Sequence, residues 1–395
     1  MMKKIDMNLI SVVALGIGSI VGAGIFALLG QVLMLSGERV YYAFVIAGIA
    51  AMFSGYSYAR LAGKYPDSGG LTDYFHIAFP DRLISGTLSL IYMLTSAISV
   101  SMMAKSFGIY AAGLFGYPPA DLEIVNSAAV VLILIMGFLN MQSAGDVGNT
   151  ETLLVAVKLF ILFGLAIAAF VQAGSAPVQA HPLITSDKVF WGSIGITFFA
   201  YAGYGVITNA SADVKNPKRT ITAAIFITLL VVMALYISLA WMVLTYIPLK
   251  ELEKNSETAI AHAARMLLGD WGYAALYVAA GLAFVTGISA TFFSIFRISR
   301  SLAKQHVLPK FYGEKFWRMG TKGNMLTVIL VVLATVLFDF SSIVNLSSGA
   351  FLVSYLGIFA ANWKLRRETE SSAAVILTGT ALMLFILVTF LMSLN

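Results

Sequence analysis

Cysteine is absent from this sequence, and charged residues are few. The 395 residues contain no Cys, and Asp, Glu, Lys and Arg together make up 11% of the chain. Without cysteine, neither a disulfide framework nor a thiolate metal site can form. Hydrophobic residues make up 59% of the chain, which is more apolar surface than a soluble globule can hide from water. The composition therefore predicts an integral membrane protein.

Several functional motifs are absent as well. The chain has no G-x-x-x-x-G-K-[ST] phosphate-binding loop and no gap between apolar segments that could house a nucleotide domain, which argues against an ATP-driven pump. It has no polar catalytic cluster within or beside the apolar segments, so we expect no enzyme, no cofactor and no metal ion. The N-terminal "MMKKIDMN" runs into an apolar stretch without an A-x-A-like cleavage site, which predicts a retained first span.

Hydropathy over a window of about 19 residues predicts an all-α chain with about 11 transmembrane helices. The predicted spans are 8–35, 40–63, 83–114, 123–141, 150–172, 189–211, 220–247, 271–299, 324–340, 343–363 and 372–393. The ninth and tenth spans are so close in sequence that they must form a tight hairpin. The gap 248–270 is expected to hold an amphipathic surface helix, and 300–323 a basic connector.

The distribution of lysine and arginine predicts the orientation, because these residues are enriched in cytoplasmic loops. Those assigned to the inside are Lys3, Lys4, Arg60, Lys64, Arg82, Lys215, Lys218, Arg219, Arg297, Arg300, Lys304, Lys310, Lys315, Arg318, Lys322, Lys364, Arg366 and Arg367. Those assigned to the outside are Arg39, Lys188, Lys250, Lys254 and Arg265. The bias predicts a multi-pass cell membrane protein (plasma or inner membrane) with a cytoplasmic N-terminus and an extracytoplasmic C-terminus. It also explains the formal charge of +6 without a nucleic acid partner.

Glycine is concentrated in two of the predicted spans. The first contains "LGIGSIVGAGIFALLG", and the sixth contains "ITFFAYAGYGVITNAS". Each glycine costs a helix roughly 1 kcal/mol relative to alanine, so such clusters weaken the helix locally. One interpretation is close helix packing through small residues. The other is that both helices unwind at membrane depth, where the freed backbone groups must line a cavity.

The positions of these two spans favour unwinding. They begin two consecutive groups of five spans, 8–172 and 189–363, and an odd number of spans per group inverts the second group relative to the first. Glycine-interrupted helices at corresponding positions of two inverted halves indicate the midplane site of a transporter. The N-terminus of a half-helix attracts an anion, and C-terminal carbonyls attract a cation, so backbone alone could hold a zwitterionic amino acid. The span 372–393 is additional to the repeat.

Three motifs resemble those of the amino acid-polyamine-organocation superfamily, whose transporters share the fold of the bacterial leucine transporter LeuT. "GSIVGAGIF" is similar to the family's first-span signature, "YARLAGKYPDSGG" to its loop after the second span, and "NASADVKNPKRTITAAI" to its acidic-x-x-Asn-Pro-Lys/Arg segment. The resemblance extends over roughly the first ten spans. Most members have twelve spans rather than eleven, and the acidic position, often Glu, is Asp213 here.

The resemblance implies a substrate site at the two glycine-rich spans. The substrate carboxylate would lie on the N–H groups around Gly22, Ala23 and Gly24. The ammonium would meet the carbonyls of Ile20, Phe199, Ala200 and Ala202. Phe199 or Tyr201 would close over the substrate as an aromatic gate, although each aromatic ring could equally be part of ordinary packing.

Two lysines lie within predicted spans, Lys105 in the third and Lys158 in the fifth. Intramembrane ionisable residues are candidates for function, but a long lysine side chain can also snorkel to the interface. For Lys105, closer to the outer end of its span, we expect snorkelling or lining of the vestibule, with substrate contact as a minor option. "LLVAVKLFILFG" resembles the lysine-bearing fifth span of ApcT-type proton-coupled members, whose ammonium occupies a position where relatives bind sodium. The resemblance implies proton coupling at Lys158, through first-span carbonyls near Gly16 and Ile17 and the hydroxyls of Thr286 or Ser289. Burial disfavours a charged lysine, so proton exchange in each cycle is chemically plausible.

The sequence thus predicts a secondary transporter that imports amino acids by proton symport and alternating access. No carboxylate lies near the middle of any span, which favours neutral substrates of broad specificity over cationic amino acids or polyamines. One alternative is a sodium- and proton-independent exchanger in which Lys158 is a permanently charged tether. An ion channel and a transporter-like sensor are further alternatives. The sequence leaves the oligomeric state open.

Overall fold

The computed structural model describes residues 7–22, 24–66, 70–118, 121–142, 147–172, 186–317 and 320–394. Its helices are α1 (Leu9–Ile20), α2 (Gly24–Ser36), α3 (Val40–Lys64), α4 (Leu71–Ala78), α5 (Arg82–Leu114), α6 (Leu122–Gln142), α7 (Val147–Gln172), α8 (Asp187–Ala200), α9 (Pro217–Tyr246), α10 (Leu249–Lys254), α11 (Ala259–Lys304), α12 (Lys322–Leu337), α13 (Phe340–Lys364) and α14 (Ala373–Ser393). The short 3₁₀ helices are η1 (Gly37–Arg39), η3 (Tyr204–Asp213), η4 (Ser256–Thr258) and η5 (Lys310–Gly313). Two strands, β1 (Lys315–Trp317) and β2 (Gly320–Thr321), form an antiparallel hairpin.

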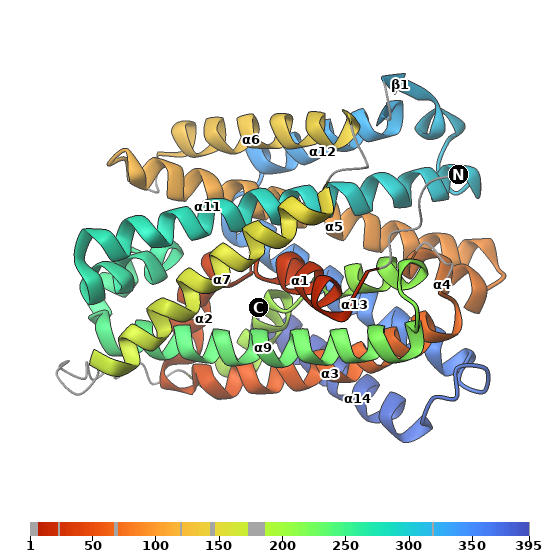
Figure 1. Ribbon diagram of the computed structural model, residues 1–395, viewed down its shortest axis with the longest axis horizontal. Helices are drawn as coiled ribbons and strands as arrows, with labels where there is room; N and C mark the ends of the chain where they lie inside the picture. The colour runs from red at the N-terminus through yellow and green to blue at the C-terminus, as the bar shows by residue number, and fades with distance from the viewer. Residues whose placement is uncertain are drawn as a thin grey trace.

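Most of the chain consists of long apolar helices. Among the described residues, nine helical segments are long and apolar enough to cross a membrane, and α1 and α12 are shorter apolar helices. The long helices lie roughly along the longest axis of the molecule, and α7 crosses them obliquely (Figure 1). The fold is therefore an all-α bundle suited to a bilayer, as the composition predicted.

Two of the predicted spans are interrupted in the middle, where the glycines cluster. The span 8–35 divides into α1, which ends at Ile20, and α2, which begins at Gly24. The span 189–211 consists of α8, which ends at Ala200, and the 3₁₀ helix η3. Gly203 lies at the second interruption with φ +121°, a conformation that L side chains rarely adopt. The helices are thus interrupted at both glycine clusters, which agrees with the interpretation that these helices unwind.

The four half-helices are arranged as two pairs. The half-helix α1 packs against η3, and α2 packs against α8. Helix α9 runs beside α1, η3 and α3, while α11 contacts α5, α6 and α7. The two interruptions therefore face each other in the interior of the bundle.

Two connecting segments differ in detail from the predictions. The gap 248–270 forms α10, η4 and the first turns of α11, which bend at Gly269 with φ 64° before the helix continues as the predicted eighth span. The connector 300–323 contains η5 and the β hairpin, which the hydropathy pattern did not indicate. Helices α12 and α13 are joined by Phe338 and Asp339 alone, but α12 packs mainly against α5 and α6 and α13 against α5 and α14, so the connection is as short as predicted while the two helices do not pack together as a hairpin.

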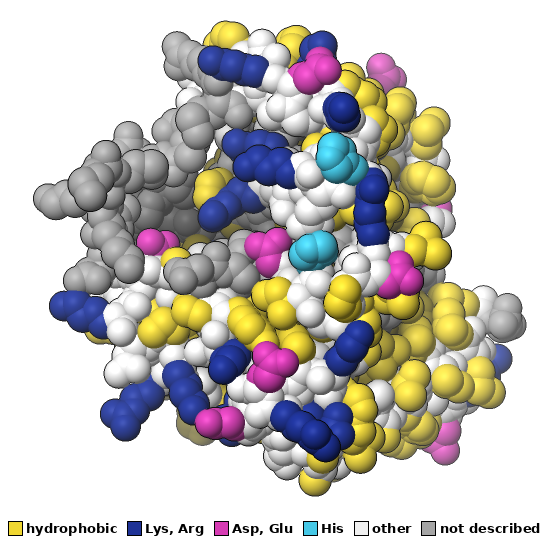
Figure 2. All heavy atoms as spheres, turned by 90° about the vertical axis from the view of Figure 1, so that its right-hand side faces the viewer, with side chains coloured by type: hydrophobic (Ala, Val, Ile, Leu, Met, Phe, Trp, Pro, Cys, Tyr) yellow, Lys and Arg dark blue, Asp and Glu magenta, His cyan; other side chains and the backbone are white. Residues whose placement is uncertain are grey.

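Basic side chains gather on one end of the molecule. This end carries α4 and β1 and lies on the right of Figure 1. Figure 2 shows lysine and arginine side chains spread over it, beside a flank that is largely apolar. The exposed residues Lys64, Lys215, Lys218 and Arg219 belong to segments that the charge pattern assigned to one side of the membrane.

Candidate functional site

The two helix interruptions touch through their backbones. A Cβ atom added to Gly24 would lie 2.5 Å from the carbonyl oxygen of Ala200, which is closer than side-chain atoms approach. A Cβ atom added to Gly203 would lie 2.9 Å from the hydroxyl oxygen of Ser19. Glycine is therefore required at both positions, because only a residue without a side chain lets the two interruptions meet.

The beginning of α2 offers N–H groups to an anion. The first four N–H groups of a helix have no partner within it, and the helix dipole adds positive potential there. Both Gly22 and Gly24 are buried at this point, and a Cβ atom on Gly22 would lie 3.0 Å from the Cα atom of Gly287 on α11. Ala23, the third residue predicted to bind the carboxylate, lies outside the described residues. The geometry suits a carboxylate held by backbone alone.

A tyrosine that the sequence did not single out joins the carbonyls at the two interruptions. The hydroxyl group of Tyr236 on α9 lies 3.0 Å from the carbonyl oxygen of Ala200 and 3.3 Å from that of Ile20. The carbonyl of Phe199 accepts from the N–H of Ala202 at 2.9 Å. Each carbonyl oxygen has two lone pairs, so these atoms retain capacity for a substrate ammonium group. The available signal was a lone tyrosine in the apolar run "VVMALYISLA", whose buried hydroxyl needs a partner.

A small cavity lies beside the interruptions. It leaves about 50 Å³ for the centres of water-sized molecules. The residues that line it are Ser19, Ile20, Gly24, Tyr92, Ser96, Ser99, Met102, Met103, Phe199, Ala202, Gly203, Val206, Thr291, Ser294 and Phe351. None of these described lining residues is charged. A water molecule needs about 10–15 Å³ on this measure, so the space corresponds to roughly three to five waters.

The two candidate gating aromatics occupy different places. The ring of Phe199 lines the cavity and stacks on Phe351 of α13, with centroids 5.3 Å apart and planes 28° apart. Tyr201 is fully buried, and its hydroxyl donates to the carbonyl of Phe44 on α3 at 3.0 Å. Of the two candidates, Phe199 therefore lies at the cavity, whereas Tyr201 ties η3 and α8 to α3.

Lys158 on α7 reaches the first interruption. Its side chain is 0% exposed, and its ammonium group lies 3.1 Å from the carbonyl oxygen of Gly18 and 3.0 Å from that of Val21. It also lies 3.3 Å from the hydroxyl oxygen of Thr286 on α11. The Thr286 hydroxyl points its own proton toward Leu282, so it serves the ammonium as an acceptor. Lys158 is thus bonded inside the protein and does not snorkel.

The other residues predicted around Lys158 lie nearby with different partners. The carbonyl of Ile17 accepts from the N–H of Val21 at the end of α1. The Lys158 ammonium donates to the carbonyls of Gly18 and Val21 rather than to that of Ile17. A Cβ atom on Gly16 would collide with Ile207 of η3, which places Gly16 at the contact between α1 and η3. The hydroxyl of Ser289 accepts from the side-chain amide of Asn140 on α6 at 3.2 Å.

Lys105, the second lysine within a predicted span, lies buried between α5 and the end of α12. Its side chain is 3% exposed, and its ammonium donates to the carbonyls of Thr335, at 2.9 Å, and Phe338. These carbonyls end α12 and have no further helical partners, so the cation satisfies them. Lys105 therefore fastens α5 to the end of α12.

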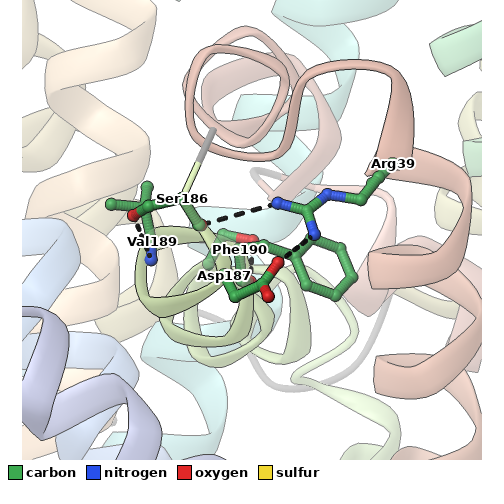
Figure 3. A network of polar contacts seen from close by, with 6 residues as sticks. Arg39, Ser186, Asp187, Val189 and Phe190 are labelled. Atoms are coloured by element: carbon green, nitrogen blue, oxygen red, sulfur yellow. Dashed lines mark hydrogen bonds and ion pairs between the residues drawn. The ribbon is translucent and has the colours of Figure 1, made fainter. Parts of the chain in front are cut away.

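An ion pair joins η1, which follows α2, to the beginning of α8. Figure 3 shows Arg39, at the end of η1, reaching Asp187 at the start of α8. The guanidinium donates to the Asp187 carboxylate at 2.7 Å and lies 4.4 Å from the centroid of the Phe190 ring. This contact ties the end of α2 to the beginning of α8. Because both charges are partly exposed, the ion pair contributes at most about 1 kcal/mol.

Known proteins resemble the whole chain. The family model described as amino acid permease matches residues 7–395. The chain is 39% identical to the inner membrane transport protein YbaT of Escherichia coli, over 98% of this chain and 90% of that protein. It is 32% identical to an uncharacterized protein of Methanocaldococcus jannaschii, over 97% and 89% of the two chains. It is 26% identical to the serine/threonine exchanger SteT of Bacillus subtilis, over 79% and 70%. The chain therefore belongs to the amino acid permease family, within the amino acid-polyamine-organocation superfamily.

Proposed function

We propose that this amino acid permease imports neutral amino acids by proton symport, with Lys158 as the group that gains and loses the proton. The observation that carries the proposal is the contact of its buried ammonium with Gly18 and Val21 at the first interruption. Moving a charged side chain out of water is costly. A buried lysine therefore stays charged only where its ammonium group is hydrogen-bonded or paired, and otherwise it loses its proton. A lysine in this position can exchange a proton and at the same moment make or break a contact between helices.

The proposed cycle follows from the contacts of Lys158 with Gly18, Val21 and Thr286. When protonated, the side chain links α7 to the end of α1 and, through Thr286, to α11. When the proton leaves, the neutral amine is a weaker donor, and α1 is released from both neighbours. Release of α1 would open the side of the site near η3, because these two half-helices pack together. Proton loss and substrate release would then occur in one step, which is alternating access.

The substrate class follows from the lining of the cavity. The carboxylate would bind at the beginning of α2, near Gly22 and Gly24, and the ammonium at the carbonyls of Ile20 and Phe199. With no charged residue among the described lining, a charged substrate side chain would have no counter-ion. This supports neutral amino acids over the cationic substrates named for two Arabidopsis thaliana relatives, which are 23% and 25% identical.

The membrane orientation and the internal repeat are also part of the proposal. A cytoplasmic N-terminus and an extracytoplasmic C-terminus are supported by the positive-inside bias and by the basic end of the molecule (Figure 2). An inverted repeat of 8–172 and 189–363, with 372–393 added, is supported by interruptions at corresponding places in its two halves. The outer gate would then lie at the Arg39–Asp187 pair.

A second candidate is a sodium- and proton-independent exchanger. It is favoured by the name of one relative, a serine/threonine exchanger that is 26% identical to this chain. In that case Lys158 stays charged throughout and only holds α1 in place.

Transport in proteoliposomes separates the two candidates. The purified protein would be given a panel of labelled amino acids, with pH and sodium gradients imposed separately. Proton symport predicts accumulation of neutral amino acids driven by an inward proton gradient and unaffected by sodium. An exchanger predicts uptake only against internal amino acid, with no response to either gradient. Uptake of no amino acid would refute both candidates.

A further inference from the structure

Hydroxyl groups form much of the polar lining of the cavity. Ser96 and Ser99 of α5 and Thr291 of α11 are among the lining residues, and Ser19, Ser294 and Tyr92 also carry hydroxyl groups. Backbone groups at the interruptions suffice for the carboxylate and ammonium that all amino acids share. The hydroxyl groups are therefore left for the part of the substrate that differs between amino acids, its side chain.

Three of these hydroxyl groups donate their protons to backbone carbonyls of their own helices. Ser96 donates to the carbonyl of Tyr92, Ser99 to that of Ser96, and Thr291 to that of Gly287, each at 2.8 Å. A hydroxyl oxygen that donates its single proton keeps its lone pairs as acceptors. The α5 and α11 walls thus present acceptors, which suit a donor on the substrate.

Two further hydroxyl groups of the lining, those of Ser19 and Ser294, can take either role. Neither Ser19 nor Ser294 makes a side-chain hydrogen bond within the described part of the chain, so each can donate or accept. A hydroxyl group on the substrate can both donate and accept, so it can bond the accepting oxygens of Ser96, Ser99 and Thr291 and also the hydroxyl groups of Ser19 and Ser294. A carboxylate has no proton to donate, and an aliphatic side chain would leave the acceptors without partners, which is costly in a buried site.

Size limits the substrate further. The space equals roughly three to five waters, and Phe199 stacked on Phe351 closes one side. Larger side chains with both donor and acceptor groups, such as glutamine or tyrosine, would need this stack to open.

We propose that the cavity selects small amino acids with a side-chain hydroxyl group, namely serine and threonine, over apolar amino acids of the same size. The inference rests on the proposed transport of neutral amino acids and narrows its substrate class. Ser96, Ser99 and Thr291 are the residues that determine this specificity. Discrimination of this kind is strongest between isosteric ligands, because only the polar contact differs between them.

Threonine and valine are such an isosteric pair, and serine and alanine are a near-isosteric one. We would measure competition by each against labelled serine in counterflow, with the full-length protein in proteoliposomes. The expected result is that threonine competes about tenfold more strongly than valine, and serine more strongly than alanine. In Ser99→Ala and Thr291→Val the ratio of threonine to valine competition should fall toward one.

Ser106→Ala is the matched control. Ser106 lies on α5 and donates to the carbonyl of Met102 at 2.9 Å, in the same way as Ser96, but it is buried outside the cavity lining. The threonine-to-valine ratio should be unchanged in this variant. Equal competition by threonine and valine in the unmodified protein would overturn the inference and leave amino acid transport intact. Absence of uptake for every amino acid would instead refute the proposed function itself.

Discussion

The ammonium of Lys158 lies 3.0 Å from the carbonyl oxygen of Val21, the residue that follows the last turn of α1. One side chain on α7 therefore holds the broken end of another helix. The same ammonium reaches Thr286 on α11, so three helices meet at a single titratable group. Movement of α1 away from α7 or α11 must break these bonds, which is why a change of charge at this point can control the conformation.

Thr286→Val should shift the pH dependence of transport. The substitution keeps the shape of the side chain but removes one acceptor from the Lys158 ammonium. The protonated state is then less favoured, and the pH of half-maximal uptake should move downward by about one to two units, since a hydrogen bond to a charged group contributes about 1.5–3 kcal/mol. Thr245→Val serves as the control, because the Thr245 hydroxyl on α9 donates to the carbonyl of Trp241 in its own helix. An unchanged pH profile in Thr286→Val would argue against the role assigned to this contact.

Gly24→Ala should abolish most transport without preventing folding into the membrane. The added methyl group would lie 2.5 Å from the carbonyl oxygen of Ala200 and 2.7 Å from its Cα atom, so the two interruptions must separate. Displacement of a site by about 1 Å can cost about a hundredfold in rate, and we expect a loss of tenfold to about a hundredfold in uptake. In Gly164→Ala the new methyl group has no neighbour within 4 Å, and transport should be retained. Similar uptake by both variants would contradict the tight contact.

Tyr236→Phe tests the bridge between the carbonyls of Ile20 and Ala200. Loss of the hydroxyl leaves the ring in place but frees both interruptions to shift, so we expect about a tenfold loss in uptake and a lower unfolding temperature. Tyr246→Phe on the same helix removes a comparable bond, to the carbonyl of Ala169 at 3.0 Å, far from the interruptions. That variant should lose stability but keep its uptake. If both variants transport equally well, the Tyr236 hydroxyl has no special role.

Asp339 caps α13, and its removal should destabilise the protein in a pH-dependent way. Its carboxylate accepts from the hydroxyl and the N–H of Ser342, and these bonds, with help from Lys105, hold its pKa below the ordinary value. The stabilisation is therefore complete above the unfolded pKa, near 4, and is lost as pH falls through the lowered pKa. Asp339→Ala should cost about 1 kcal/mol at neutral pH, and Asp339→Asn less, because Asn is also a good cap. Thermal unfolding in detergent at several pH values would reveal the difference, and a cost for Asp339→Ala that persists at acid pH would contradict it.

Local sequence features predicted the backbone of the site well. The glycine clusters indicated both interruptions, because a helix without side chains at successive turns is locally weak and its glycines permit close backbone contact. The apolar run around Lys158 showed that a cation is buried there. Both signals are local, since they depend on residues close together in the chain.

Contacts between distant segments could not be predicted in the same way. The sequence suggested Gly16 and Ile17 as neighbours of Lys158, but the helical bond from Val21 to Ile17 leaves Gly18 and Val21 as the partners. The hydroxyl lining from α5 and α11 has no local signature, and the lone tyrosine at position 236 indicates a hydrogen-bond partner without showing which one. Lys105 looked like a lysine able to reach the interface, and only the position of the end of α12 shows why it stays buried.

The most direct test of the account is proton-driven accumulation by Lys158→Ala in proteoliposomes. The variant should still bind and equilibrate amino acids, because the groups proposed to bind the substrate are backbone atoms of the two interruptions. Counterflow in the absence of a gradient measures this property and shows that the variant is folded. The account predicts that an inward proton gradient drives accumulation by the unmodified protein but not by Lys158→Ala. Accumulation by the variant with unchanged dependence on the pH gradient would contradict proton coupling at Lys158.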